Sequence, residues 1–70
     1  MAKTRYMLRI WFHGWPEPQE LRLTTDNVIV TYGVDGYSHV MAGKDGSKKL
    51  ADIVRFKAKV VNWDIAVCND

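Results

Sequence analysis

The chain has 70 residues, a formal net charge of +2, 47% hydrophobic residues and 26% charged residues. This is the composition of an ordinary globular domain, so it excludes a disordered chain and predicts a single small domain over residues 1–70. No apolar run approaches the roughly 20 residues of a membrane span, and residues 1–10 lack the apolar core of a signal peptide. The single cysteine, Cys68, excludes an internal disulfide, and we expect a cytoplasmic protein without membrane contact.

Residues 5–13 alternate between two kinds of side chain, with the period of two that is typical of a half-buried strand. One side is apolar and is predicted to face the core; it consists of Tyr6, Leu8, Ile10 and Phe12. The other side is mixed and is predicted to face outward; it consists of Arg5, Met7, Arg9, Trp11 and His13. The first predicted strand therefore has one face suited to folding and one face suited to contact with another molecule.

The segment Gly14–Pro18 interrupts this strand, because Pro16 and Pro18 have no backbone N–H to donate to a sheet. A second strand is predicted from residue 21, with Leu21, Leu23 and Thr25 inward and Arg22 and Thr24 outward. The sequence Thr-Thr-Asp-Asn at 24–27 is a turn signal, because Asp and Asn side chains readily bond their own backbone.

Residues 28–34 alternate again and predict a third strand. Asp35–Gly36 follows, and Asp-Gly between two apolar runs favours a hairpin with a type I′ turn. Residues 37–41 are then predicted to form a fourth strand, antiparallel to the third.

The pattern of the residues after the basic loop at 43–49 fits either a helix or a strand. Leu50, Ile53 and Val54 fall near helical spacing, whereas Val54, Phe56 and Ala58 alternate with basic residues as a strand would. We expect a short helix or turn over 48–53 and then strand. The last strand is predicted over 61–68, with a bulge or bend between Val60 and Val61, where the alternation changes phase.

Five or six short strands with frequent turns predict a mostly β fold, a small antiparallel sheet curled into an open barrel with at most one short helix. The alternative is an α+β fold, in which one helix over about 47–59 packs on a four- to five-stranded antiparallel sheet. A core this small commonly needs extra stabilisation. Because disulfides are excluded and zinc-ligand pairs are missing, we expect a homo-oligomer.

The sequence contains no spacing typical of a nucleophile with its base, of a carboxylate pair or of a metal site. We therefore expect neither an enzyme nor a metal or other cofactor. Segments 1–13 and 44–59 are basic and bracket an acidic segment, so a positive patch forms if the fold brings them together.

The leading hypothesis is a non-catalytic binding protein for an anionic ligand, either a nucleotide or a nucleic acid. Arginines beside an aromatic ring suit phosphate contact and base stacking. The candidate ligand-binding residues are Arg5, Arg9, Trp11, His13, Arg22, Lys44, Lys48 and Lys49. The alternative is a protein-partner module, such as an inhibitor, a phage-type accessory protein or an assembly subunit. Such a module would use Trp11, Trp15 and the strand edges as its interface.

Overall fold

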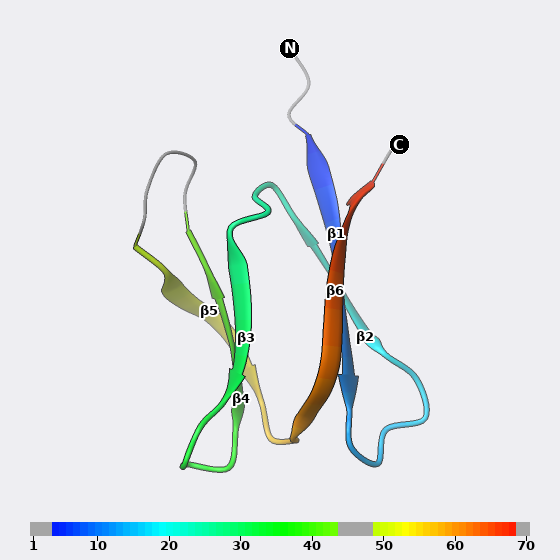
Figure 1. Cartoon of the computed structure of the whole chain (residues 1–70), viewed down its shortest axis with the longest axis vertical. Coiled ribbons are helices and arrows are strands. Elements are labelled where there is room, and N and C mark those ends of the chain that lie inside the picture. Colours follow the sequence, from blue (N-terminus) through cyan, green and yellow to red (C-terminus); the bar gives the residue numbers. More distant parts are fainter. Residues whose placement is uncertain (1–3, 44–48, 69–70) are drawn as a thin grey trace.

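The structure of the protein, a computed structural model, describes residues 4–43 and 49–68 (Figure 1). Those residues form six strands and no helix. The strands are β1 (Arg5–Phe12), β2 (Gln19–Leu23), β3 (Val28–Tyr32), β4 (Ser38–Ala42), β5 (Ala51–Phe56) and β6 (Val60–Cys68). Nothing in this part of the chain is a helix long and apolar enough to cross a membrane.

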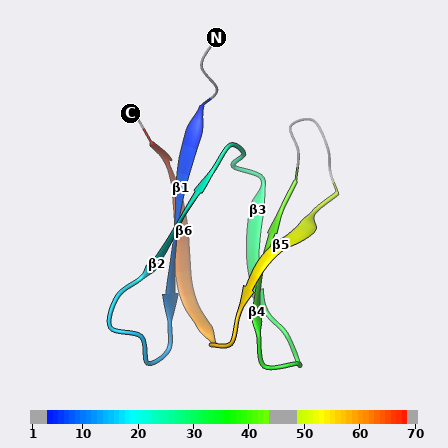
Figure 2. The same ribbon diagram turned by 180° about the vertical axis from the view of Figure 1, so that it is seen from behind.

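The strands form two antiparallel sheets with three strands each, in the orders β2-β1-β6 and β3-β4-β5. Residues 57–59 connect the edge strand of one sheet, β5, directly to the edge strand of the other, β6. The two sheets lie side by side and meet at this connection (Figures 1 and 2). The predicted mostly β class is therefore confirmed, as a curled and open arrangement that does not close into a barrel.

The predicted helix is wrong. Residues 51–53 belong to β5, so neither the short helix over 48–53 nor the longer helix over 47–59 forms there, and residue 48 lies outside the described part of the chain. The physical reason is long-range pairing, because Val54 lies opposite Val40 and Phe56 lies opposite Ser38 of β4. In this register the side chains of Val54 and Phe56 pack against the core.

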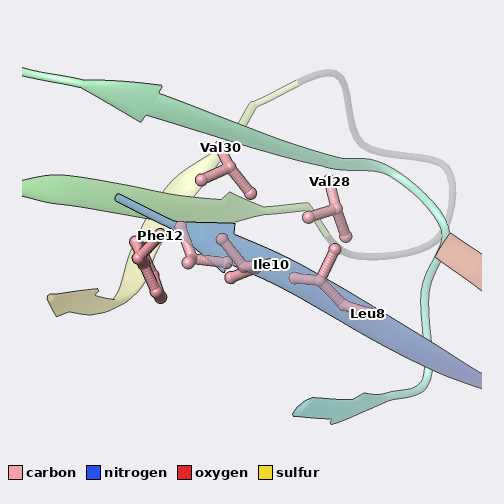
Figure 3. Close-up of a cluster of buried hydrophobic side chains, with 6 residues drawn as sticks. Leu8, Ile10, Phe12, Val28 and Val30 are labelled. Atoms are coloured by element: carbon pink, nitrogen blue, oxygen red, sulfur yellow. The ribbon is translucent and has the colours of Figure 1, made fainter. Parts of the chain in front are cut away.

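The core lies between the two sheets. Its buried hydrophobic side chains come mainly from β1 and β3 and meet in the middle of the molecule (Figure 3). They are Leu8, Ile10, Phe12, Val28, Val30 and Val40. The apolar side of the first predicted strand therefore supplies half of the buried core, as the alternation of residues 5–13 predicts.

The β3–β4 hairpin is confirmed, but its turn is not type I′. The amide of Gly36 donates to the carbonyl of Gly33 at 3.1 Å, so the turn spans residues 33–36. Gly36 has a φ of +85°, whereas no residue other than glycine has a positive φ in the described chain. A type I′ turn needs a positive φ at Asp35 as well. Residues 33–37 therefore connect the two strands in place of residues 35–36 alone, and β3 ends at Tyr32.

The predicted bulge between Val60 and Val61 is confirmed. Trp11 pairs with Asn62, but the next residue, Phe12, pairs with Val60, so Val61 has no partner in β1. An extra residue of this kind bends the strand, and here it bends the chain just after it leaves β5.

Ser38 holds this bend in place. Its side chain is fully buried; its hydroxyl donates to the carbonyl of Ala58 at 2.6 Å and accepts from the amide of Val60 at 2.9 Å. The amide of His13 donates to the carbonyl of Lys59 at 2.8 Å. The connection between the sheets is thus tied both to β4 and to the end of β1.

Candidate functional site

Four of the predicted ligand-binding residues lie on one surface, the outer face of the sheet β2-β1-β6. We call Arg5, Arg9, Trp11 and Arg22 on this surface the Arg/Trp face. Arg5, Arg9 and Trp11 alternate along β1 with the buried core residues, and Arg22 of β2 pairs with Met7, which lies between the two arginines of β1. The spacing of two residues is what places these side chains on the same side of the strand.

Acidic neighbours moderate the charge of the Arg/Trp face. Arg9 lies opposite Glu20 in β2 and opposite Asp64 in β6. Its Nη2 donates to Oδ2 of Asp64 at 3.2 Å, and its Nε donates to Oδ1 at 3.4 Å. Both side chains are nearly half exposed, so the pair contributes about 0–1 kcal/mol and a phosphate can compete for Arg9.

Arg9 also lies over an aromatic ring. Its guanidinium carbon is 5.5 Å from the centroid of the Trp11 ring. A cation over the face of tryptophan is attracted by the negative charge of that face. The contact keeps the guanidinium and the indole together at the surface, where both can touch a ligand.

His13 and Trp15, the other two predicted binding residues near the end of β1, have different roles. His13 is exposed and lies just past the end of β1, two residues after Trp11. The Trp15 ring packs 4.6 Å from Phe12 and 6.1 Å from Phe56, measured between centroids. Trp15 therefore covers the end of the core, and 42% of it stays exposed.

The predicted lysines do not join the Arg/Trp face. Lys49 is exposed and precedes β5, which belongs to the other sheet. Figure 2 shows β5 and β1 in separate sheets, on different sides of the molecule. Lys44 and Lys48 lie outside the described residues. Lys49 therefore does not extend the Arg/Trp face, and the part of the basic segment 44–59 that reaches the end of β1 is Lys59, whose carbonyl accepts from the His13 amide.

The structure brings together a second basic surface that the sequence did not single out. It consists of Arg55, Lys57 and Lys59, which we call the basic corner, because these residues lie where the chain turns from β5 to β6. The Cζ atom of Arg55 is 5.0 Å from the Tyr37 ring centroid, and Nζ of Lys59 is 5.8 Å from that of Tyr32. Within residues 4–43 and 49–68, none of the three cations forms an ion pair.

His39 occupies the outer face of the other sheet, between two carboxylates. Its Nε2 is 3.0 Å from Oδ2 of Asp35, and its Nδ1 is 3.6 Å from Oδ2 of Asp52. The two ring nitrogens thus face different carboxylates, and of the two only Nε2 is within hydrogen-bond distance of its partner. No group of three metal-binding side chains is found in the described part of the chain.

Asp35 gives the fold a dependence on acid pH. The amide of Tyr37 donates to its Oδ1 at 3.1 Å, and this bond, followed by the contact with His39, holds the pKa of Asp35 below its ordinary 3.8. A carboxylate with a lowered pKa stabilises the fold fully above pH 3.8, and that stabilisation is lost as the pH falls through the lower pKa of the folded state.

We therefore expect the stability of Asp35→Asn to fall less steeply than that of the unmodified protein as the pH drops below 3.8, because asparagine does not titrate. Thermal unfolding followed across the acid range measures this slope for both proteins. Asp26→Asn is the matched control, since Asp26 is an exposed carboxylate in a different turn. If Asp35→Asn and the unmodified protein lose stability with the same acid slope, the Asp35 contacts do not stabilise the hairpin.

Comparison of the chain with protein-family models, with curated proteins and with solved structures finds no match. The function therefore has to be argued from the chemistry of the Arg/Trp face, the basic corner and the strand edges.

Proposed function

We propose that this chain is a non-catalytic binding protein that holds an anionic ligand, a nucleotide or a nucleic acid, on the Arg/Trp face. The observation that supports this function most is the Arg9 guanidinium over the ring of Trp11, a residue that is only partly buried. Phosphate groups supply most of the affinity in nucleic-acid binding and aromatic rings supply stacking partners for bases. The Arg/Trp face offers both, with Arg5 and Arg22 as further phosphate contacts.

The small positive charge of the Arg/Trp face favours reversible binding of an anionic ligand. Three arginines face two acids, Glu20 and Asp64, so the surface keeps only a small positive excess. Because the Arg9–Asp64 pair is exposed, its replacement by an Arg9–phosphate pair costs little. A strongly salt-dependent and moderate affinity is therefore expected.

The test is the loss of binding when Trp11 is replaced. We expect Trp11→Ala to weaken binding of a fluorescein-labelled oligothymidylate by about 5- to 150-fold, the range that stacking on one aromatic side chain provides. Fluorescence anisotropy measures the affinity, and circular dichroism checks that the variant is folded. Ile29→Ala is the control, because Ile29 is 43% exposed on the other sheet. Equal affinities of the Trp11 and Ile29 variants would contradict the proposal.

The second candidate function is assembly with a second copy of the chain through the free edge of β6. This edge strand is the longest of the six, and it contains no proline, glycine or lysine, the residues that commonly protect an edge. Val61 and Val67 on this strand are 60% and 59% exposed. Such an edge favours pairing with another strand.

The β6 strands of two copies can pair without placing like charges opposite each other. The only charged side chain of β6 is Asp64, which already pairs with Arg9. An antiparallel pairing of β6 with itself, centred on Ile65, places Asp64 of one copy opposite Ala66 of the other. The same register places Trp63 opposite Val67, so the apolar faces of the two copies join in one sheet.

We expect native mass spectrometry to show a dimer, and Val67→Lys to shift it to a monomer, because a charged side chain opposite Trp63 disrupts the pairing. Val34→Lys is the control, because Val34 is fully exposed in the β3–β4 turn, away from this edge. A monomeric unmodified protein, or a Val67→Lys variant that remains dimeric, would exclude this interface.

A further inference from the structure

We propose that the basic corner is a second ligand-binding site and that the ligand is single-stranded nucleic acid, which runs round the end of the molecule from Trp11 to Tyr37. The inference rests on the proposed function of the Arg/Trp face and names its ligand class. It adds the basic corner and the two rings beside it, Tyr32 and Tyr37, to the residues that contact the ligand.

The first support is the number of cations that lie over aromatic rings. Within the described residues, three cations lie 5.0–5.8 Å from the centroid of an aromatic ring, a distance at which the two groups attract each other. One is on the Arg/Trp face, and the other two are at the basic corner, Arg55 with Tyr37 and Lys59 with Tyr32. Of the three rings, Tyr32 is exposed and Trp11 and Tyr37 are partly exposed, and positive groups beside accessible rings are the elements that bind single strands.

The second support is that the cations of the basic corner are available. Arg9 forms an ion pair with Asp64. In contrast, the cations of the basic corner form no ion pair within the described residues. Alternation explains their direction, because Phe56 between Arg55 and Lys57 packs on Phe12 in the core. The nearby Tyr32 ring is 49% exposed, so a base can stack on it.

The third support is that the basic corner is fixed directly beside the end of the Arg/Trp face. The bond from the amide of His13 to the carbonyl of Lys59 joins the end of β1 to the corner, and His13 follows Trp11 by two residues. The two bonds of Ser38 hold the same bend against β4. The corner is therefore held in position before any ligand binds, which lowers the cost of binding.

A strand, and not a mononucleotide, fits this arrangement. Trp11 lies on the outer face of one sheet and Tyr37 on the outer side of the other, so one nucleotide fills only one ring site. Bases in a duplex are already stacked and paired, so their faces are not free for tyrosine or tryptophan. A flexible single strand has free base faces and a phosphate at each nucleotide.

The experiment compares Tyr32→Ser with Tyr32→Phe in anisotropy titrations. Oligothymidylates of about 4 and about 12 nucleotides sample the range of site sizes known for single-strand binding domains. We expect Tyr32→Ser to weaken binding of the longer strand by about 5- to 150-fold and to leave the shorter strand unaffected. Tyr32→Phe keeps the ring and should keep both affinities, while circular dichroism confirms that each variant is folded.

A second variant separates charge from stacking. Lys57→Gln combined with Lys59→Gln should lower the slope of log K against log salt by about 1.4 for the longer strand, because each phosphate contact in a single strand contributes about 0.7. If the unmodified protein binds the strands and these variants bind them equally well, the basic corner is not a site, although the Arg/Trp face remains one. If the unmodified protein binds neither strand, both the proposed function and this inference are wrong.

Discussion

Ile10→Ala is expected to destabilise the protein by about 2–5 kcal/mol, the range measured when a buried isoleucine or leucine is truncated. Ile10 is fully buried in β1, and in the described part of the chain five other hydrophobic side chains are buried with it. A domain of 70 residues has a total stability of about 4–10 kcal/mol. This one substitution therefore removes a large part of the stability.

Urea unfolding followed by tryptophan fluorescence measures the effect. Ile29→Ala is the matched control, because it removes the same atoms from a side chain that is 43% exposed on the opposite side of β3 from the core. The control should cost less than about 1 kcal/mol, as surface substitutions usually do. Equal losses at the two positions would contradict the burial of Ile10 between the sheets.

Ser38→Ala is expected to cost about 1–3 kcal/mol, although it removes a single oxygen atom. That hydroxyl serves both the carbonyl of Ala58 and the amide of Val60, and the substitution leaves these two partly buried groups without a partner. The loss should be accompanied by faster hydrogen exchange of the Val60 amide, because the bend between β5 and β6 opens more often.

Thr31→Ala is the control for Ser38→Ala, because Thr31 also loses a hydroxyl but is exposed in β3. Its stability should change by less than about 0.5 kcal/mol. If Ser38→Ala unfolds at the same urea concentration as Thr31→Ala, and its Val60 amide exchanges at the unmodified rate, Ser38 does not hold the bend.

Much of the fold could be predicted from the sequence, because alternation is a local signal. In β1 the alternation correctly predicts that Leu8, Ile10 and Phe12 enter the core, although Tyr6 on the same side is only half-buried, and the change of phase at Val61 predicts the bulge that β1 and β6 form. The hairpin between β3 and β4 follows from Asp35–Gly36. Its turn type does not follow, because the backbone bond between Gly33 and Gly36 selects a different geometry.

The region before Arg55 could not be predicted locally. Leu50, Ile53 and Val54 fit a helix or a strand by spacing alone, and only the pairing of residues 51–56 with β4 decides between them. Ile53 sits at a shift in that pairing, between Asp52 opposite Met41 and Val54 opposite Val40. The extra residue disturbs the alternation and makes a strand resemble a helix in sequence.

The candidate site was predictable only from the alternation of β1 and β2, which places Arg22 on the outer side of β2. The alternation places Arg5, Arg9 and Trp11 together, but the pairing of Arg9 with Asp64 joins residues that are far apart in sequence. The basic corner depends on the same kind of information, since Tyr32 reaches Lys59 only through the folded chain. The sequence identifies the cations of the basic corner, but it does not show that the Tyr32 and Tyr37 rings lie beside them.

The most direct test of the proposed function is an NMR titration of the isotope-labelled protein with an oligothymidylate of about 12 nucleotides, within the range of known single-strand binding sites. We predict that the largest chemical-shift changes occur at the indole N–H of Trp11, at the Arg9 guanidinium and at the amides of residues 55–59. Residues of the core side of β3 should change little. An unchanged spectrum, or changes confined to the free edge of β6, would contradict the binding of nucleic acid by the Arg/Trp face and the basic corner.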